Sequence, residues 1–183
     1  MIFMCYYYIE IKINGEKLME KVAKFEKISY EQWRKDFGDN DNHSYDGVLD
    51  EIEMPSRSDP NSAGYDIHSP YDVVLAPGEE HKFPTGLKCK IKDGWFMGAF
   101  PRSSLGFKYY TRLANTIGVI DSSYYNNSGN EGHIWVKIRN EGSETLEIKT
   151  GDRICQMIFL PYGITEDDDA TGERTGGIGS SGK

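Results

Sequence analysis

Cysteine is scarce in this sequence. Three cysteines, Cys5, Cys89 and Cys155, occur in 183 residues, and they form neither a C-x-x-C pair nor an even-numbered disulfide framework. Small secreted domains depend on such frameworks, so the pattern favours a reducing compartment. We expect the three side chains to be small buried thiols that pack in the core.

Long apolar runs are missing as well. No stretch approaches the ~20 apolar residues that cross a bilayer. The opening segment MIFMCYYYIEIKI is apolar, but it lacks the basic start and the small-residue cleavage site of a signal peptide. Its alternating Tyr and Ile residues indicate a strand instead. We therefore expect a cytoplasmic protein that does not contact membranes.

Positive charge is in deficit. The chain has 21 Lys and Arg residues against 29 Asp and Glu, which gives a formal net charge of −8. The electric field of a negatively charged protein repels polyanions, so non-specific nucleic-acid binding is disfavoured. A phosphate ligand would need local cations, backbone N–H groups or a metal to bind it. A hydrophobic fraction of 38% and an aromatic fraction of 13% are nevertheless typical of a folded chain.

Helical periodicity is confined to the first part of the chain. The segment MEKVAKFEKI predicts a short strand, and SYEQWRKDF then places a Ser at an N-cap position before Trp33 and Phe37 at helical spacing. The acidic, turn-rich segment GDNDNHSYDG predicts an exposed loop. Residues 1–50 are thus interpreted as strands, a helix and an acidic loop appended to the main body.

The rest of the chain has the texture of an all-β protein. From residue 51 onward, short β-like runs are separated by Pro and Gly, and no strand-helix-strand alternation occurs. The pattern predicts an antiparallel sandwich, jelly roll or barrel and argues against a doubly wound or P-loop fold. We expect a jelly-roll-like β-barrel core at residues 51–172 and a flexible Gly- and Ser-rich end at residues 173–183.

Polar residues gather at turns, where a β scaffold would present a site. In NSAGYDIHS the carboxylate is Asp66, which taken alone is most often a turn former or a hydrogen-bond cap. In PRSSLGFK, Arg102 can pair with a phosphate, and Ser103 and Ser104 can donate to bridging oxygens. The alternative is an arginine paired with a structural carboxylate beside two turn serines.

Two further segments carry candidate chemistry. In NTIGVIDSSYY, Asp121 ends a strand and could take a proton from water, while Tyr124 could form the wall of a small pocket. An Asp-Ser pair is equally a common turn. In GDRICQMIFLP, Gln156 lies within an apolar strand, where an inward-pointing amide would need partners, and Asp152 and Arg153 could be an exposed turn pair.

The tail adds a possible anion site. Backbone N–H groups and hydroxyls of RTGGIGSSG could wrap an anion as a nest does. The segment does not match G-x-x-x-x-G-K-[ST], so a P-loop is rejected.

Taken in order, SAGYDIHS, PRSSLGFK, NTIGVIDSSYY, GDRICQMI and RTGGIGSSG resemble the five ordered motifs of the homotrimeric dUTPase family over roughly residues 51–183. The resemblance implies Mg²⁺-dependent hydrolysis of dUTP to dUMP and pyrophosphate, by attack of water on the α phosphorus. It also implies a homotrimer whose active sites are shared between subunits, and a tail that closes over the substrate as a mobile lid.

The resemblance also implies residue roles. Asp121 matches the aspartate that activates the attacking water, Arg102 and Gln156 match residues that orient the reacting groups, and Asp66 matches the aspartate that contacts water on the Mg²⁺. Tyr124 matches the aromatic that packs under the deoxyribose. The substrate-binding positions are Ser103, Ser104, Asn115, Gly118, Ile120, Tyr124, Arg174, Ile178, Gly179, Ser180 and Ser181.

The chain departs from the family pattern at three places. Ile178 replaces the aromatic that usually stacks on uracil, and Arg174 lies one residue closer to the Gly pair than is common. The segment YNNSGNEG, residues 125–132, makes a longer loop than usual after Tyr124. Two other functions therefore stay open: a related dCTP deaminase, although no Glu is clearly placed as its base, and a nucleotide-gated binding module that recruits a regulatory protein.

Overall fold

Short antiparallel strands dominate the computed structural model, which describes residues 12–13, 16–17, 19–37, 46–172 and 176. In chain order the elements are β1 (Lys12–Ile13), β2 (Glu16–Lys17), β3 (Ala23–Lys27), α1 (Tyr30–Phe37), α2 (Asp46–Glu51), β4 (Tyr65–His68), β5 (Val73–Leu75), β6 (Glu80–Pro84), β7 (Leu87–Ile91), β8 (Trp95–Pro101), α3 (Ser103–Tyr109), β9 (Thr111–Leu113), β10 (Gly118–Ile120), the 3₁₀ turn η2 (Ser122–Tyr124), β11 (Trp135–Asn140), β12 (Leu146–Ile148) and β13 (Arg153–Pro161).

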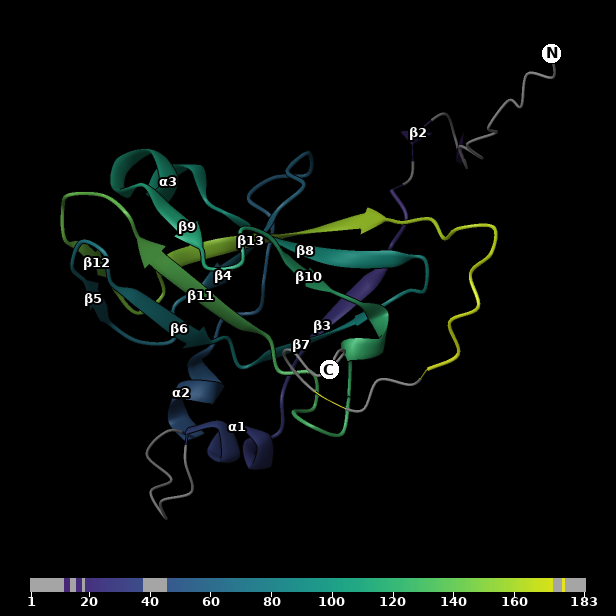
Figure 1. Cartoon of the computed structure of the whole chain (residues 1–183), viewed down its shortest axis with the longest axis horizontal. Helices are drawn as coiled ribbons and strands as arrows, with labels where there is room; N and C mark the ends of the chain where they lie inside the picture. The colour runs from purple at the N-terminus through teal and green to yellow at the C-terminus, as the bar shows by residue number, and fades with distance from the viewer. Residues whose placement is uncertain (1–11, 14–15, 18, 38–45, 173–175, 177–183) are drawn as a thin grey trace.

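The strands form a jelly-roll arrangement of small sheets (Figure 1). The largest sheet has the order β10-β8-β13-β4, a second has the order β6-β11-β9, and β12-β5, β3-β7 and β1-β2 form two-stranded pairs. Every pairing is antiparallel. The predicted all-β jelly-roll class is confirmed. Among the described strands, however, the sheets do not close into the barrel that the sequence suggested, because hydrogen bonding is interrupted between the sheets.

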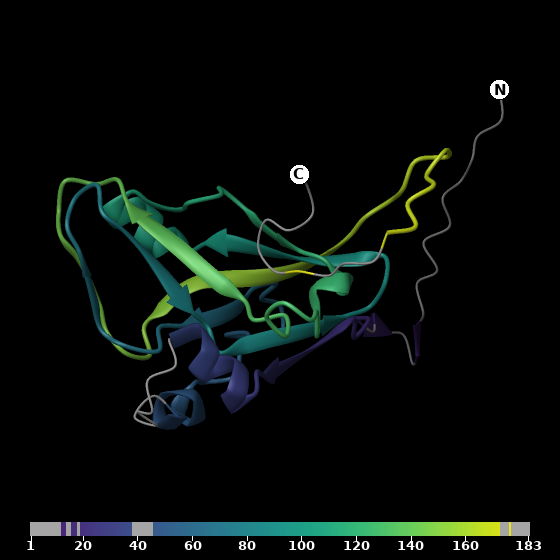
Figure 2. The same ribbon diagram turned by 60° about the horizontal axis from the view of Figure 1, so that its bottom comes forward.

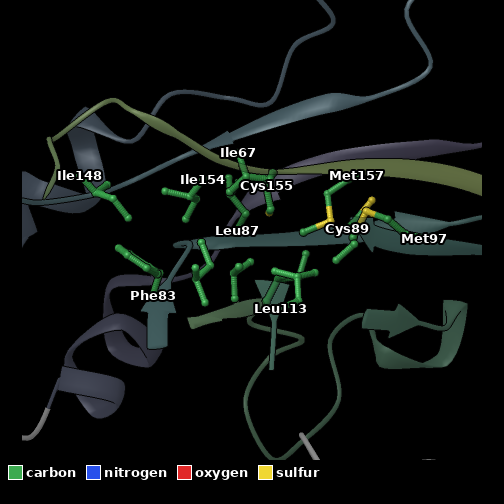
Figure 3. Close-up of a cluster of buried hydrophobic side chains, with 14 of the residues drawn as sticks. Ile67, Phe83, Leu87, Cys89, Met97, Leu113, Ile148, Ile154, Cys155 and Met157 are labelled. Atoms are coloured by element: carbon green, nitrogen blue, oxygen red, sulfur yellow. The ribbon is translucent and has the colours of Figure 1, made fainter. Parts of the chain in front are cut away.

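One hydrophobic core lies between these sheets (Figure 3). Its members alternate along the strands: in β11, Val136 and Ile138 are buried while Lys137 and Arg139 are exposed. This period of two places one face of each strand on the core. Burying a large side chain such as Phe83, which is fully buried, contributes about 1.5–3 kcal/mol.

Two of the three cysteines confirm the interpretation drawn from their scarcity. Cys89 and Cys155 are free, buried thiols within this core. Burial raises the pKa of Cys89 to about 12 and raises the pKa of Cys155 as well, because a thiolate would lose its hydration there. Cys5 lies outside the described residues.

The predicted strand and helix of the N-terminal part are present. Strand β3 pairs with β7 of the core, with Phe25 opposite Cys89. Helix α1 begins after Ser29, whose Oγ accepts a hydrogen bond from the Gln32 N–H at 3.1 Å, as an N-cap does. Trp33 is fully buried in a second small cluster.

Two other helices were not predicted. Helix α2 begins at Asp46, within the last two residues of the segment interpreted as an exposed loop, and residues 38–45 of that segment lie outside the described residues. Leu49 of α2 packs in the cluster of Trp33. Helix α3 begins at Ser103 within the segment PRSSLGFK that was interpreted as a turn, and its C-cap residue, Tyr110, has a left-handed backbone conformation. Figure 2 shows α1 and α2 together on one side of the strands, away from α3. None of the helices described here is long and apolar enough to span a bilayer.

Candidate functional site

The first group of candidate residues meets where β4, β13 and the end of β8 run side by side. Gln156 of β13 lies opposite Asp66 of β4 on one side and opposite Phe100 of β8 on the other. Arg102 follows β8 directly and is the N-cap residue of α3. Three segments far apart in sequence are therefore brought to one place by strand register.

Asp66 is the centre of the charge in this group. Its carboxylate pairs with Nε of Arg102 at 3.2 Å and accepts a hydrogen bond from Nη1 of Arg153 at 3.3 Å. The Asp66 side chain is 15% exposed and that of Arg153 is 48% exposed. The sequence had left open whether Arg102 pairs with a carboxylate, and in this structure it pairs with Asp66. Arg153 was interpreted as part of an exposed turn pair with Asp152, and its contact with Asp66 was missed.

Gln156 has the partners that its position demanded. Its Nε2 donates to the carbonyl oxygen of Pro101 at 3.1 Å. On its other side lies Gly64, where an added Cβ would stand 2.4 Å from Oε1 of Gln156. The amide is therefore held between the end of β8 and a backbone that approaches closely because it has no side chain.

A cavity of about 790 Å³ opens beside this group. Its polar lining includes Arg102, Ser103 and Gln156, and its apolar lining includes Phe107 and Ile158. A smaller hollow of about 220 Å³ is lined by Ser104, Asp152, Arg153 and Arg102. The guanidinium and hydroxyl donors of the larger cavity suit an anionic group of phosphate or carboxylate type.

The second group of candidate residues lies on the loop between β9 and β10, on β10 itself and on the turn after it. Asn115 is exposed in the loop between β9 and β10, and the Ile117 N–H donates to its carbonyl oxygen at 2.7 Å. Gly118 is buried against Ala99, whose Cβ would be 3.0 Å from an added Cβ. Ile120 is half-buried and ends β10.

Asp121 and Tyr124 are the first and last residues of the turn that follows. Asp121 is the half-buried N-cap residue of η2, and its carbonyl oxygen accepts a hydrogen bond from the Tyr124 N–H at 3.1 Å. The Tyr124 ring is 6% exposed. Its hydroxyl donates to the carbonyl oxygen of His133 at 2.9 Å. In this chain Tyr124 thus packs in the core and leaves little of its surface accessible to a ligand.

The two groups lie at opposite ends of β8. Ile120 is opposite Met97 near the start of this strand, whereas Arg102 follows Pro101 at its end. With a rise of about 3.3 Å per residue, Asp121 and Arg102 are separated by on the order of 20 Å along the strand. Figure 1 shows η2 and α3 at these opposite ends. One chain therefore presents two half-sites and does not bring Asp121 to Arg102 and Gln156.

The predicted site also includes residues of the tail and a metal ion. Residues Arg174, Ile178, Gly179, Ser180 and Ser181 lie outside the described residues. Within the part of the chain that the structure describes, no three His, Cys, Asp or Glu side chains gather as a metal cluster. A lone carboxylate such as Asp66 fits Mg²⁺ only where other oxygens, such as phosphates and water, supply most of the ligands.

Comparison with known proteins identifies the family. The dUTPase family model matches residues 50–182. The chain is 43% identical over 133 residues to deoxyuridine 5'-triphosphate nucleotidohydrolase of Lactococcus lactis, a match that covers 72% of this chain and 89% of the relative. It is 39% identical over 144 residues to the protein of the same name from Tolumonas auensis, covering 74% and 91%.

Solved structures agree. The crystal structure of dUTPase from Streptococcus mutans superposes with a TM-score of 0.60 at 32% identity, covering 78% of this chain and 98% of that one. The dUTPase from phage phi11 of S. aureus shares the fold, with a TM-score of 0.59 at 20% identity over 83% of this chain and 97% of that one. The chain belongs to the dUTPase family, and the resemblance drawn from the five motifs is confirmed.

Proposed function

We propose that this chain hydrolyses dUTP to dUMP and pyrophosphate in the cytoplasm, as a homotrimer in which each active site is assembled from different subunits. The observation that carries the proposal is the pair of half-sites at opposite ends of β8, in a chain whose relatives are named for this reaction. In the trimer, the half-site with Asp121 of one chain would face the half-site with Arg102 and Gln156 of its neighbour, so that two chains together complete each active site.

Arg102, Ser103 and Gln156 form the phosphate side of the proposed site. Arg102 and Ser103 line the larger cavity with donors, and Gln156 is fixed by Pro101 and Gly64. Asp66 pairs with the Arg102 guanidinium and would contact water on the Mg²⁺ that enters with the phosphates. Bound Mg²⁺ would neutralise phosphate charge, as it does in other phosphate-transfer sites.

Asp121 is the proposed general base on the other half-site. Its carboxylate would hold the water that attacks the α phosphorus and would accept its proton, a role worth typically ~10² to 10⁴ in rate. The segment of Asn115, Gly118 and Ile120 would bind the uracil ring, and Tyr124 would limit the space beneath the sugar. The lid would comprise Arg174, Ile178, Gly179, Ser180 and Ser181, and would exclude water by closing over the phosphates.

A substrate panel tests the reaction. Release of pyrophosphate is measured from dUTP, UTP, dTTP and dCTP, with and without Mg²⁺, for the wild type and Asp121→Asn. We expect Mg²⁺-dependent release from dUTP alone, and a loss of about two orders of magnitude or more in the variant. The matched control Asp72→Asn changes an exposed aspartate bound to Thr150 and should keep full activity. Ammonia release from dCTP would instead favour the deaminase alternative.

Complementation tests the shared site. Asp121→Asn and Arg102→Ala are each inactive under the proposal, but chains co-expressed in equal amounts would mix. In a cyclic trimer with sites shared between neighbours, about one quarter of the sites combine an intact Asp121 with an intact Arg102. Recovery of that share of wild-type activity is expected. No recovery from mixed trimers would show that each chain completes its own site.

A further inference from the structure

The long loop at residues 125–132 is bound to helix α1 at its far end. Glu131 has a left-handed backbone, with φ 58°, which is uncommon for a residue other than glycine. Its carboxylate accepts hydrogen bonds from the Ser29 N–H at 3.1 Å, from Ser29 Oγ at 2.6 Å and from Lys88 Nζ at 2.6 Å. Because Ser29 is the N-cap of α1, this anion sits at the positive end of the helix.

The electrostatics of Glu131 agree with this placement. Burial opposes its ionisation, but the hydrogen bonds from Lys88 and Ser29 outweigh burial and lower its pKa. Lys88 itself is mostly buried, with its side chain 13% exposed, and also donates to Oδ1 of Asn126 at 2.9 Å. Lys88 therefore connects both ends of the loop to strand β7.

A second connection runs through His133. Its Nε2 accepts a hydrogen bond from the Gly86 N–H at 3.0 Å, so the ring proton is on Nδ1 when the imidazole is neutral, and Nδ1 donates to Asp36 near the end of α1. The imidazole is completely buried. The carbonyl oxygen of the same residue accepts the Tyr124 hydroxyl. Helix α1 is thus linked through one residue to the turn that begins at Asp121.

The loop itself closes tightly over Tyr124. The side-chain amide of Asn127 donates to the Tyr124 carbonyl at 2.8 Å, and that of Asn130 donates to the Tyr124 hydroxyl at 2.7 Å. Gly132 has φ 80°, and an added Cβ there would lie 2.7 Å from the Tyr124 carbonyl oxygen. The Tyr124 end of η2 is therefore fixed by contacts that originate in the loop, and the Tyr124 N–H in turn donates to the carbonyl oxygen of Asp121 at the other end of the turn.

We infer that helix α1 and the 125–132 loop form one positioning unit for the turn that carries Asp121, with Glu131 as its principal positioning residue. The inference rests on the proposed function, since it concerns how the general base of that reaction is held. Neither Glu131 nor α1 touches the substrate in this role. They act by fixing the direction in which Asp121 meets the half-site of the neighbouring chain.

The position of a general base matters because a displacement of about 1 Å can cost roughly 10²-fold in rate. Glu131→Gln keeps the size of the side chain and removes its charge. We expect kcat for dUTP to fall about 10-fold or more. KM should change less than kcat, because the residues proposed to bind the phosphates lie on the other half-site and the residues proposed to bind uracil precede the turn. Ser29→Ala should reproduce part of this loss, and Ser29→Thr, which keeps the hydroxyl, should retain wild-type kcat.

Amide hydrogen exchange supplies a readout independent of activity. In the intact protein, the Glu131→Gln and Ser29→Ala variants should exchange faster than wild type at residues 121–133, while the core strand β11 beyond Trp135 keeps its protection. The control Glu80→Gln removes an ion pair with Lys137 on an exposed face of β6 and β11. It should change neither exchange at 121–133 nor kcat.

The outcomes separate the two proposals. A wild type without dUTP turnover would contradict the proposed function, and the exchange measurement would still show whether α1 holds the turn. An active wild type whose Glu131→Gln variant keeps both kcat and exchange protection would overturn this inference alone. Equal loss of protection across the whole chain in Glu131→Gln would also overturn it, because the residue would then support the fold in general.

Discussion

Replacement of Gly132 by alanine should destabilise the protein through two separable effects. The residue has φ 80°, a left-handed conformation that costs a residue with a Cβ about 1–2 kcal/mol. The added Cβ would also lie 2.7 Å from the Tyr124 carbonyl oxygen and 3.0 Å from the Asn126 backbone nitrogen. Both are backbone atoms, so relief needs a shift of the chain, which typically costs a further ~1–3 kcal/mol.

Two other glycines separate these effects. Gly151 has φ 82° with no atom within 4 Å of an added Cβ, and Gly163 has neither a left-handed φ nor a neighbour within 4 Å. Gly151→Ala should therefore cost only the conformational part, about 1–2 kcal/mol. Gly163→Ala should change stability by less than about 0.5 kcal/mol, as is usual at the surface.

Urea unfolding at one fixed protein concentration measures the three variants against the wild type. A loss of about 3 kcal/mol in Gly132→Ala, at a slope of about 1–3 kcal/mol per M, lowers the midpoint by roughly 1 M or more. The order of the midpoints should be Gly163→Ala above Gly151→Ala above Gly132→Ala. Equal midpoints for Gly132→Ala and Gly151→Ala would refute the close approach between the loop and Tyr124.

Three other perturbations have defined outcomes. Gly64→Ala should displace the Gln156 amide and lower kcat for dUTP about 10-fold. Stability should change little, since the closest atom to the added Cβ, Oε1 of Gln156, is the end of a flexible side chain. An unchanged kcat would contradict this role. Phe83→Ala should cost about 3–5 kcal/mol in urea unfolding, and a cost under about 1 kcal/mol would contradict its core position. The folded state lowers the pKa values of Asp36 and Glu131. Their stabilisation is present above the unfolded-state pKa values, near 4, and is lost as pH falls through the folded-state values. Glu131→Gln should therefore flatten the decline of stability in acid; an unchanged slope would count against the ion pair.

The sequence predicted the helix whose formation depends on residues close together in the chain. The N-cap at Ser29 and the spacing of Trp33 and Phe37 identified α1, because both act within a few residues. Helix α2 is six residues long, which is too short for helical periodicity to show in the sequence. It is stabilised by the packing of Leu49 against Trp33 of α1, a contact between two separate segments of the chain. Helix α3 contains Gly106, a poor helix former, and so resembled a turn.

The sequence predicted individual residues of the candidate site but not the contacts between them. Gln156 was singled out because a polar amide within an apolar strand needs partners, and Pro101 provides one. The pairing of Asp66 with both Arg102 and Arg153 depends on strand order, which single-strand patterns do not encode. The bulge between Arg153 and Cys155 breaks the regular alternation that would have oriented Arg153. The link from Glu131 to α1 joins residues about a hundred positions apart, beyond the reach of spacing rules.

The separation of Asp121 from Arg102 along β8 affects how the turnover per chain depends on the concentration of the protein. A single chain has every described candidate group but cannot bring the two ends of one strand together. If neighbouring chains complete the sites, turnover per chain would fall steeply on dilution below the concentration at which trimers dissociate. A cell that made only a few copies would then have almost no activity, and activity would rise sharply once synthesis passed a threshold.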